Sequence, residues 1–217
     1  GQTLSRDWLG EDGSAVSLSL AQSGALQSAS DELGTTLSRS LAHSVGLVWQ
    51  GAANGTRQQF ASVSAGDSRS FGDDANSFQM VNLQWSRRTQ LTRASSWSGH
   101  LTLQFTRSRS ESDDPAAAPV PGDGGWQRFA TGTLSYEQQR FWGVPQLRFS
   151  AHAGVSTQQL ERRDSGDIDA PLHRVSRSLE ARLDYTIGRL DARLAVRAAR
   201  VDERSVASIV ARVQRRF

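Results

Sequence analysis

Apolar and polar residues alternate one by one through much of this chain, and this pattern constrains its fold more than any other feature. In the segment SLEARLDYTI, the odd-numbered positions from Leu179 to Ile187 are apolar, and the positions between them are polar or charged. Successive side chains of a β-strand point to opposite faces of a sheet. The segment therefore predicts a strand with one apolar face and one charged face.

The same alternation recurs along the chain and predicts about ten strands, with 8–12 as the range. Besides residues 178–187, the alternating segments are 15–22, 33–40, 45–50, 80–86, 97–107, 130–138, 147–155, 189–200 and 207–217. Gly188-Arg189 has the length of a tight hairpin turn. Consecutive strands joined in this way predict an antiparallel up-and-down meander.

The expected connections differ in length. Short connections are expected at residues 41–43, 87–93, 140–145 and 188–189, and long polar ones at 53–76, 111–125 and 158–173, with shorter members of the second set at 24–31 and 201–204. Short turns on one side and longer loops on the other are typical of a transmembrane β-barrel.

Closure into a barrel removes the edges of such a sheet, but periodicity alone does not say which face meets water. Three features favour a barrel in lipid. Opposite charges share the polar faces of the late strands, aromatic residues lie near expected strand ends as interfacial belts do, and the apolar faces contain few large residues suited to a packed core. The residues then expected to line the lumen are His100, His152, Glu180, Arg182, Asp184, Asp191, Arg193, Arg197 and Arg212.

The final segment, VASIVARVQRRF, resembles the C-terminal signature strand of bacterial outer-membrane β-barrel proteins. The resemblance is carried by the alternation through Val213 and by the terminal Phe217, with Arg215 as a departure on the apolar side. It implies a Gram-negative outer membrane, contact with lipid and lipopolysaccharide, and recognition of Phe217 and Val213 by the barrel-assembly machinery. An even strand number would place both termini in the periplasm. The late strands also resemble the barrels that accompany exopolysaccharide secretion loci.

Catalytic candidates are few. The segment DSGDIDAPLHR places Asp167, Asp169 and His173 in an expected extracellular loop, and outer-membrane proteases of the omptin family use acidic and Asp-His pairs near the extracellular mouth. The spacing does not match a tight dyad, and a solvated acidic loop explains the same residues. We therefore expect no enzyme activity, with a hydrolase at the extracellular rim as the runner-up.

Composition excludes several other classes. The chain has no cysteine, which removes disulfides and thiolate metal sites. No metal-ligand spacing, phosphate-binding loop or cofactor motif is present, and no basic patch indicates nucleic acid. No apolar stretch approaches the ~20 residues of a transmembrane helix. We expect a single domain over residues 1–217, with a trimmed periplasmic region before residue 1 left open.

These observations favour a non-catalytic anchor or a component of an envelope secretion assembly, with polysaccharide as a cargo. About ten strands enclose little more than their own side chains, so the lumen charges predict a plug of ion pairs. A narrow, porin-like channel lined by arginine is the alternative.

Overall fold

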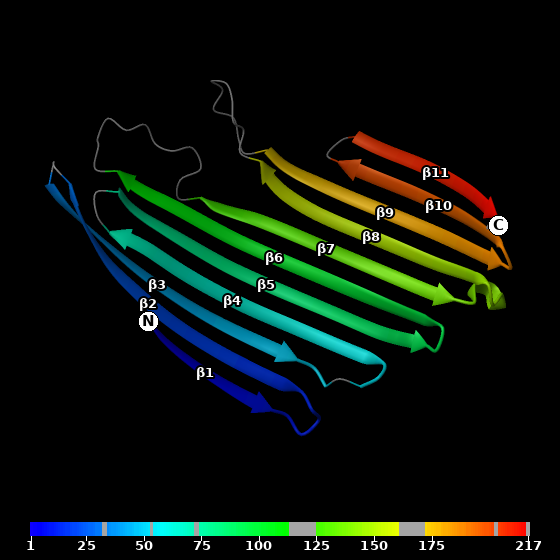
Figure 1. The fold of residues 1–217 in the computed structure, drawn as a ribbon, viewed down its shortest axis with the longest axis horizontal. Helices are drawn as coiled ribbons and strands as arrows, with labels where there is room; N and C mark the ends of the chain where they lie inside the picture. Colours follow the sequence, from blue (N-terminus) through cyan, green and yellow to red (C-terminus); the bar gives the residue numbers. More distant parts are fainter. Residues whose placement is uncertain are drawn as a thin grey trace. The chain divides into compact units, whose positions relative to one another are not determined.

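Eleven antiparallel strands follow one another in a single up-and-down order, and neighbours in sequence are neighbours in the sheet (Figure 1). The computed structural model describes residues 1–31, 34–52, 54–71, 74–112, 125–160, 172–201 and 204–215. The strands are β1 (Gln2–Leu9), β2 (Ala15–Asp31), β3 (Gly34–Gln50), β4 (Arg57–Phe71), β5 (Asp74–Thr92), β6 (Ser95–Ser112), β7 (Trp126–Gln139), β8 (Leu147–Leu160), β9 (Leu172–Ile187), β10 (Leu190–Val201) and β11 (Arg204–Arg215). The predicted all-β, up-and-down architecture is confirmed, with a strand number inside the predicted range.

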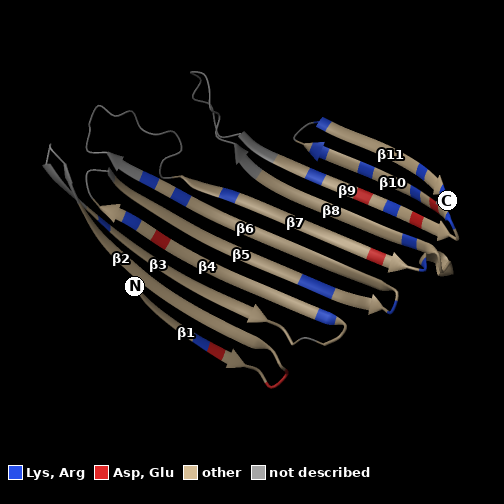
Figure 2. Cartoon of the chain, in the orientation of Figure 1, with Lys and Arg blue, Asp and Glu red and all other residues tan. Residues whose placement is uncertain are grey.

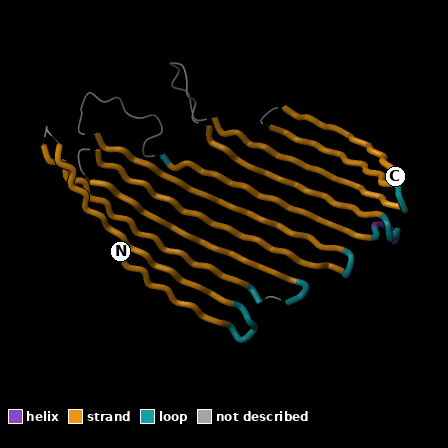
Figure 3. The backbone as a smooth tube through the Cα atoms, in the orientation of Figure 1, coloured by secondary structure: helices purple, strands orange, loops and turns teal. Residues whose placement is uncertain are grey.

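The strands are unusually long. All but β1 contain 12 to 19 residues, whereas strands of globular proteins usually contain about 3–10. A strand needs about 9–11 residues to cross a bilayer when it is tilted. Every strand from β2 to β11 therefore has the length to span a membrane. Figure 3 shows how little of the described chain lies outside strands.

Contacts between residues divide the chain into two compact units. The first contains residues 1–51, 61–84 and 103–128, and the second contains residues 52–60, 85–102 and 129–217. In the first unit, β2 pairs with β1 on one side and with β3 on the other, and the β2–β3 register runs from Ala15↔Gln50 to Asp31↔Gly34. In the second unit, β8, β9, β10 and β11 pair in sequence, and β7 pairs with β8.

Several predicted boundaries are wrong. The turn expected at residues 41–43 lies inside β3, and the loop expected at 24–31 lies inside β2, because these two strands pair continuously over 17 residues each. The long loop expected at 53–76 contains β4, and β1 was not predicted. Most of the residues expected in the loops at 111–125 and 158–173 lie outside the described part of the chain.

The prediction that both termini lie on one side depended on an even number of strands. The described residues form eleven strands, so the premise of an even number is not met, and the location of the termini stays a prediction. The connections at 93–94, 140–146 and 188–189 follow β5, β7 and β9. These three strands and β11 run in the same direction, so they end at the same end of the antiparallel set. We call this the short-turn end of the strands in the second unit.

The turn between β1 and β2 is held by Asp12. Its Oδ1 accepts hydrogen bonds from the Ser14 hydroxyl at 2.6 Å and the Ser14 backbone N–H at 2.9 Å, and Gly13 adopts the left-handed conformation with φ 81°. The hydroxyl first, and then the backbone N–H, hold the pKa of the Asp12 carboxyl below its ordinary value because they stabilise the charged form.

This lowered pKa gives a pH prediction. The carboxylate's contribution to the turn is fully present above its ordinary pKa and is lost as the pH falls through the lowered value. Ser14→Ala should move the pKa of Asp12 upward toward the ordinary value, as measured by NMR titration of its side-chain carboxyl. An unchanged pKa in Ser14→Ala would show that the hydroxyl does not stabilise the charge.

The described residues do not form an apolar core. Ala195 is the only buried apolar side chain among them, whereas many Leu, Val, Ile, Phe and Trp side chains are exposed. No helix in the described part of the chain is long and apolar enough to cross a membrane.

Candidate functional site

The strand register of the second unit collects charged residues on one face of β8 to β11. Register positions that lie directly beside one another form two rows. The first row is Arg148, Asp184, Arg193 and Arg212, and the second is His152, Glu180, Arg197 and Ser208. We call this surface the charged face. Figure 2 shows the clustering of basic and acidic residues on β9 and β10.

The opposite face of the same strands is apolar. One of its rows runs from Leu134 through Ala153, Leu179 and Ala198 to Ala207. Large side chains of this face are open: Leu134 is 53% exposed, Leu179 is 55% exposed and Ile209 is 74% exposed. Ala195, the buried apolar residue, belongs instead to the charged face, where it lies beside Arg182. The usual distribution of a water-soluble sheet is therefore inverted.

Ion pairs form on the charged face, both between the neighbouring strands β9 and β10 and within β9. The Arg197 Nε lies 3.0 Å from Glu180 Oε2, and its Nη2 donates to Oε1 at 3.3 Å. Asp184 forms ion pairs with two arginines. Arg193 Nε donates to its Oδ1 at 2.8 Å, and Arg182 Nε lies 2.6 Å from its Oδ2.

Three other residues predicted to line the lumen are His152, His100 and Asp191. His152 Nδ1 contacts Ser135 Oγ at 3.0 Å, and His100 Nε2 contacts Thr102 Oγ1 at 3.0 Å. Each is a hydrogen bond to one hydroxyl group, and Glu180, which lies beside His152 in the register, is paired with Arg197. Asp191 also interacts with a neighbour and lies in register with Thr186 and Gln214.

The hydrolase candidates gain no support. Asp167 and Asp169 lie outside the described residues. His173 is in β9 in register with Gln159, and its side chain is not described. Among the described residues, no three His, Asp or Glu side chains gather closely enough to hold a metal ion.

A cavity of about 630 Å³ opens on the charged face near its short-turn end. Its charged lining residues are Arg148, Arg182, Asp184, Asp191, Arg193 and Arg212. Four arginines and two aspartates leave an excess of positive charge. Sequence reasoning missed Arg148, although its position one residue before the apolar Phe149 would have placed it on the polar face.

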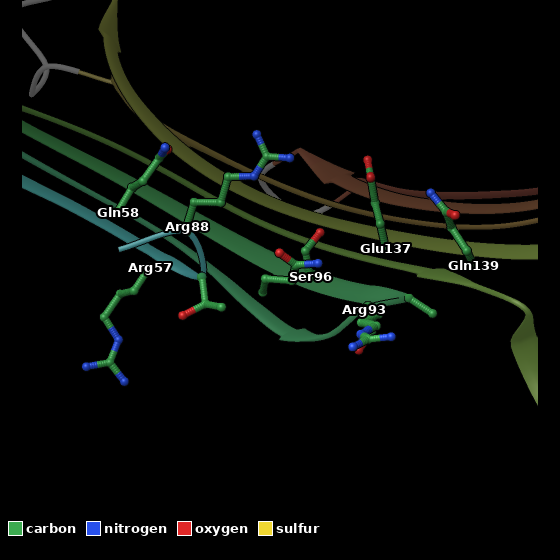
Figure 4. Close-up of a pocket in the computed structure, with 12 residues that line it drawn as sticks. Arg57, Gln58, Arg88, Arg93, Ser96, Glu137 and Gln139 are labelled. Atoms are coloured by element: carbon green, nitrogen blue, oxygen red, sulfur yellow. The ribbon is translucent and has the colours of Figure 1, made fainter. Parts of the chain in front are cut away.

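A second polar cavity of about 320 Å³ lies among the starts of β4 and β6 and the ends of β5 and β7. Arg88, Glu137 and Gln139 extend to one side of the strands here, while Arg57 extends to the other (Figure 4). Sequence reasoning missed Arg88 because residues 87–93 were assigned to a turn, and it missed Arg57 because residues 53–76 were assigned to a loop. In the structure, β5 continues to Thr92.

An aromatic cluster occupies the connection between β7 and β8. Phe141 stacks on Trp142 with ring centroids 4.6 Å apart and on Phe149 at 4.9 Å. Arg140 and Trp142 both adopt left-handed backbone conformations, with φ 57° and 53°, which is uncommon outside glycine. The resulting turn presents Trp142 with 80% of its surface exposed.

The chain forms long antiparallel strands in an up-and-down order. In the second unit, one face of these strands is charged and the other is apolar and exposed. We compared this fold and sequence with those of known proteins. No family model matches the sequence, and no curated protein sequence matches it. A solved structure with a similar fold is the outer membrane transporter YddB from Escherichia coli, with a TM-score of 0.54 and 12% sequence identity.

That likeness covers 97% of this chain and 35% of the transporter chain. The chain thus spans about a third of the length of the protein it resembles. At this identity, the likeness supports the strand architecture and not a shared activity. It agrees with the predicted fold class.

Proposed function

We propose that this protein is an integral outer-membrane β-barrel whose apolar face contacts lipid and whose charged face encloses water. The observation that carries the proposal is the inversion in the second unit. Leu179 on the apolar face of β9 is 55% exposed, whereas Ala195, the only buried apolar residue among the described residues, lies on the charged face. Exposing a continuous apolar surface of this kind to water is unfavourable, and lipid removes the cost. Strand length and the similarity to an outer membrane transporter support the same proposal.

The turn that contains Trp142 suits a position at the boundary between lipid and water. Tryptophan is enriched at the boundary between hydrocarbon and water because its ring is apolar and its N–H is polar. Trp142, next to Arg140 at the short-turn end, would lie at the periplasmic headgroups if β11 ends in the periplasm. The side chains of the charged face would then fill the lumen.

Within this proposal, the protein serves the envelope without catalysis, as an anchor or as a component of an export assembly. The ion pairs of the charged face support a largely filled interior, since they form between β9 and β10 and within β9 rather than leaving these charges free. The resemblance of the late strands to exopolysaccharide secretion barrels makes polysaccharide the favoured cargo. Cross-linking in intact cells followed by purification should recover a partner from an export assembly. Recovery of the isolated chain alone would contradict this role.

Membrane insertion is tested by refolding the purified chain into liposomes. The inserted protein should show a β-rich circular dichroism spectrum, resist added protease and migrate faster on a gel before heating than after it. A chain that stays folded and monodisperse in water without detergent would contradict the proposal.

Phe217, which lies outside the described residues, gives a separate prediction about assembly. If the terminal aromatic is read by the barrel-assembly machinery, deleting Phe217 should lower the amount of protein in the outer membrane severalfold while its synthesis continues. The measurement is the ratio of membrane-inserted to total protein after a pulse of expression. Equal ratios in the full-length and truncated chains would remove this role from Phe217.

The excess of arginine in the 630 Å³ cavity favours the narrow channel as a second candidate. Planar-bilayer recordings should then show anion-selective conductance. Absence of conductance from an inserted protein would favour the filled interior.

A further inference from the structure

We propose that the charged face carries a binding site for a compact anionic group, a carboxylate or a phosphate, between Arg148 and Arg212. The inference rests on the proposed membrane fold, in which this face encloses water. It goes beyond the anchor role because it assigns a ligand chemistry to particular residues. The site lies in the 630 Å³ cavity near the short-turn end of β8 to β11.

Positive charge exceeds negative charge in one register row of the charged face. Arg148, Arg193 and Arg212 share the row with a single carboxylate, that of Asp184. Both oxygens of that carboxylate are occupied, Oδ1 by Arg193 and Oδ2 by Arg182. Asp184 therefore already offsets the charge of two arginines, and its single negative charge leaves the row and the neighbouring Arg182 with an excess of positive charge.

The two outer arginines of this row, Arg148 and Arg212, retain hydrogen-bond donors. Arg148 lies beside Asp184 in the register but makes no ion pair with a described residue. Arg212 donates from Nη2 to the neutral Oε1 of Gln214 at 3.0 Å and not to a carboxylate. Each guanidinium has five N–H donors, so both retain donors for an incoming anion.

The size and the arginine side chains of the cavity suit a small anionic ligand. Its volume falls within the range of about 300–1,000 Å³ that is common for sites of small ligands. The planar guanidinium matches carboxylate and phosphate oxygens in a two-point contact. Asp184 holds Arg182 and Arg193 in place, so a ligand would meet a largely ordered positive surface. The carboxylates of Asp184 and Asp191 would discourage a highly charged polyanion and favour a single anionic group.

The test measures binding to the purified, folded full-length chain in detergent at constant ionic strength. Inorganic phosphate and glucuronate serve as the anionic probes, and glucose serves as the neutral control. We expect at least one anion to bind and glucose not to bind. Binding of phosphate alone would indicate a free phosphate group as the source of the charge, and binding of glucuronate alone would indicate an acidic sugar.

The decisive variant is Arg148→Gln, which breaks no ion pair among the described residues and so should leave the fold intact. It should weaken anion binding about tenfold, which corresponds to the loss of one charge-assisted hydrogen bond. Arg212→Gln should act in the same direction. The matched control Arg57→Gln removes the same charge outside this cavity and should leave the affinity unchanged.

Two results would overturn the site. One is absence of binding of both anions to a chain that inserts into liposomes, a result that would leave the proposed membrane fold standing. The other is an equal loss of affinity in Arg148→Gln and Arg57→Gln, because binding would then follow net charge and not this cavity. Failure to insert into liposomes would count against the membrane fold instead.

Discussion

Replacing Leu134 with arginine should destabilise the membrane-inserted protein by about 2–4 kcal/mol, the cost of an arginine on the lipid face near the middle of a bilayer. Leu134 lies inside β7 on the apolar face and is 53% exposed. In lipid, its replacement would bring a charge into hydrocarbon. In water, the same replacement at an exposed position would have little effect or increase solubility.

The adjacent residue supplies the control. Thr133 lies on the same strand, pairs with Gly154 and points to the face that carries His152 and Glu180. Thr133→Arg adds the same side chain and the same charge at nearly the same depth, but on the side proposed to face water. We expect a change within about 1 kcal/mol, as for ordinary surface substitutions.

The pair is measured by reversible urea unfolding from lipid vesicles. The difference between the two variants matters more than either value, because it cancels effects of charge on the unfolded chain. If both arginines were tolerated equally, or if Thr133→Arg were the more damaging, the apolar face would not be in contact with lipid.

Asp184→Asn should have the second largest effect, a loss of about 1–2 kcal/mol of stability. The change keeps the shape of the side chain but removes the carboxylate shared by Arg182 and Arg193. These arginines are 36% and 48% exposed, so solvent screening keeps the cost below that of a fully buried pair. The repulsion left among the arginines of the row adds to the loss.

Glu180→Gln is the matched comparison. Among the described residues, Glu180 pairs with Arg197, which is 61% exposed, so loss of this ion pair should cost about 0.2–1 kcal/mol. The two variants can be compared by urea unfolding at low and high salt. The difference between them should shrink as salt is added, because screening weakens the interactions of exposed charges. Equal costs at all salt concentrations would show that Asp184 is not the centre of the charged face.

The late strands could be predicted closely because each has a strict alternation. In β9 and β10, charged and apolar residues alternate with few exceptions, so face and pairing follow directly from the pleat of a strand. The register then places Glu180 beside Arg197 and Asp184 beside Arg193. These four residues were identified from the sequence, although their individual partners depend on the register of the hairpin.

The early strands were harder because their faces are not distinct in sequence. In β4, serine, alanine and glycine occupy both faces, and Asp67 and Arg69 interrupt the alternation. Asp67 in fact accepts a hydrogen bond from Arg69 Nε at 2.9 Å. Small polar residues give little local preference for a strand, and backbone pairing with neighbouring strands decides the outcome.

Arg148 was missed for a different reason, which is the register between strands. Arg148 stands at the start of β8, next to a turn that contains Phe141 to Gly143. Its identity as a member of the Asp184 row depends on the pairing of β8 with β9. The periodicity within one strand indicates the face of a residue, but only the register indicates which residues lie beside it.

The most direct test of the inverted faces is a scan of β8 by single cysteines, which the absence of native cysteine allows. The positions are Ser150, His152 and Ser156 on one face and Ala151, Ala153 and Val155 on the other. Each cysteine carries a fluorescent label in the liposome-inserted protein and is exposed to a lipid-bound quencher and to aqueous iodide. The account predicts lipid quenching at Ala151, Ala153 and Val155 and iodide quenching at the other three. Equal iodide quenching at all six positions, or the opposite alternation, would contradict it.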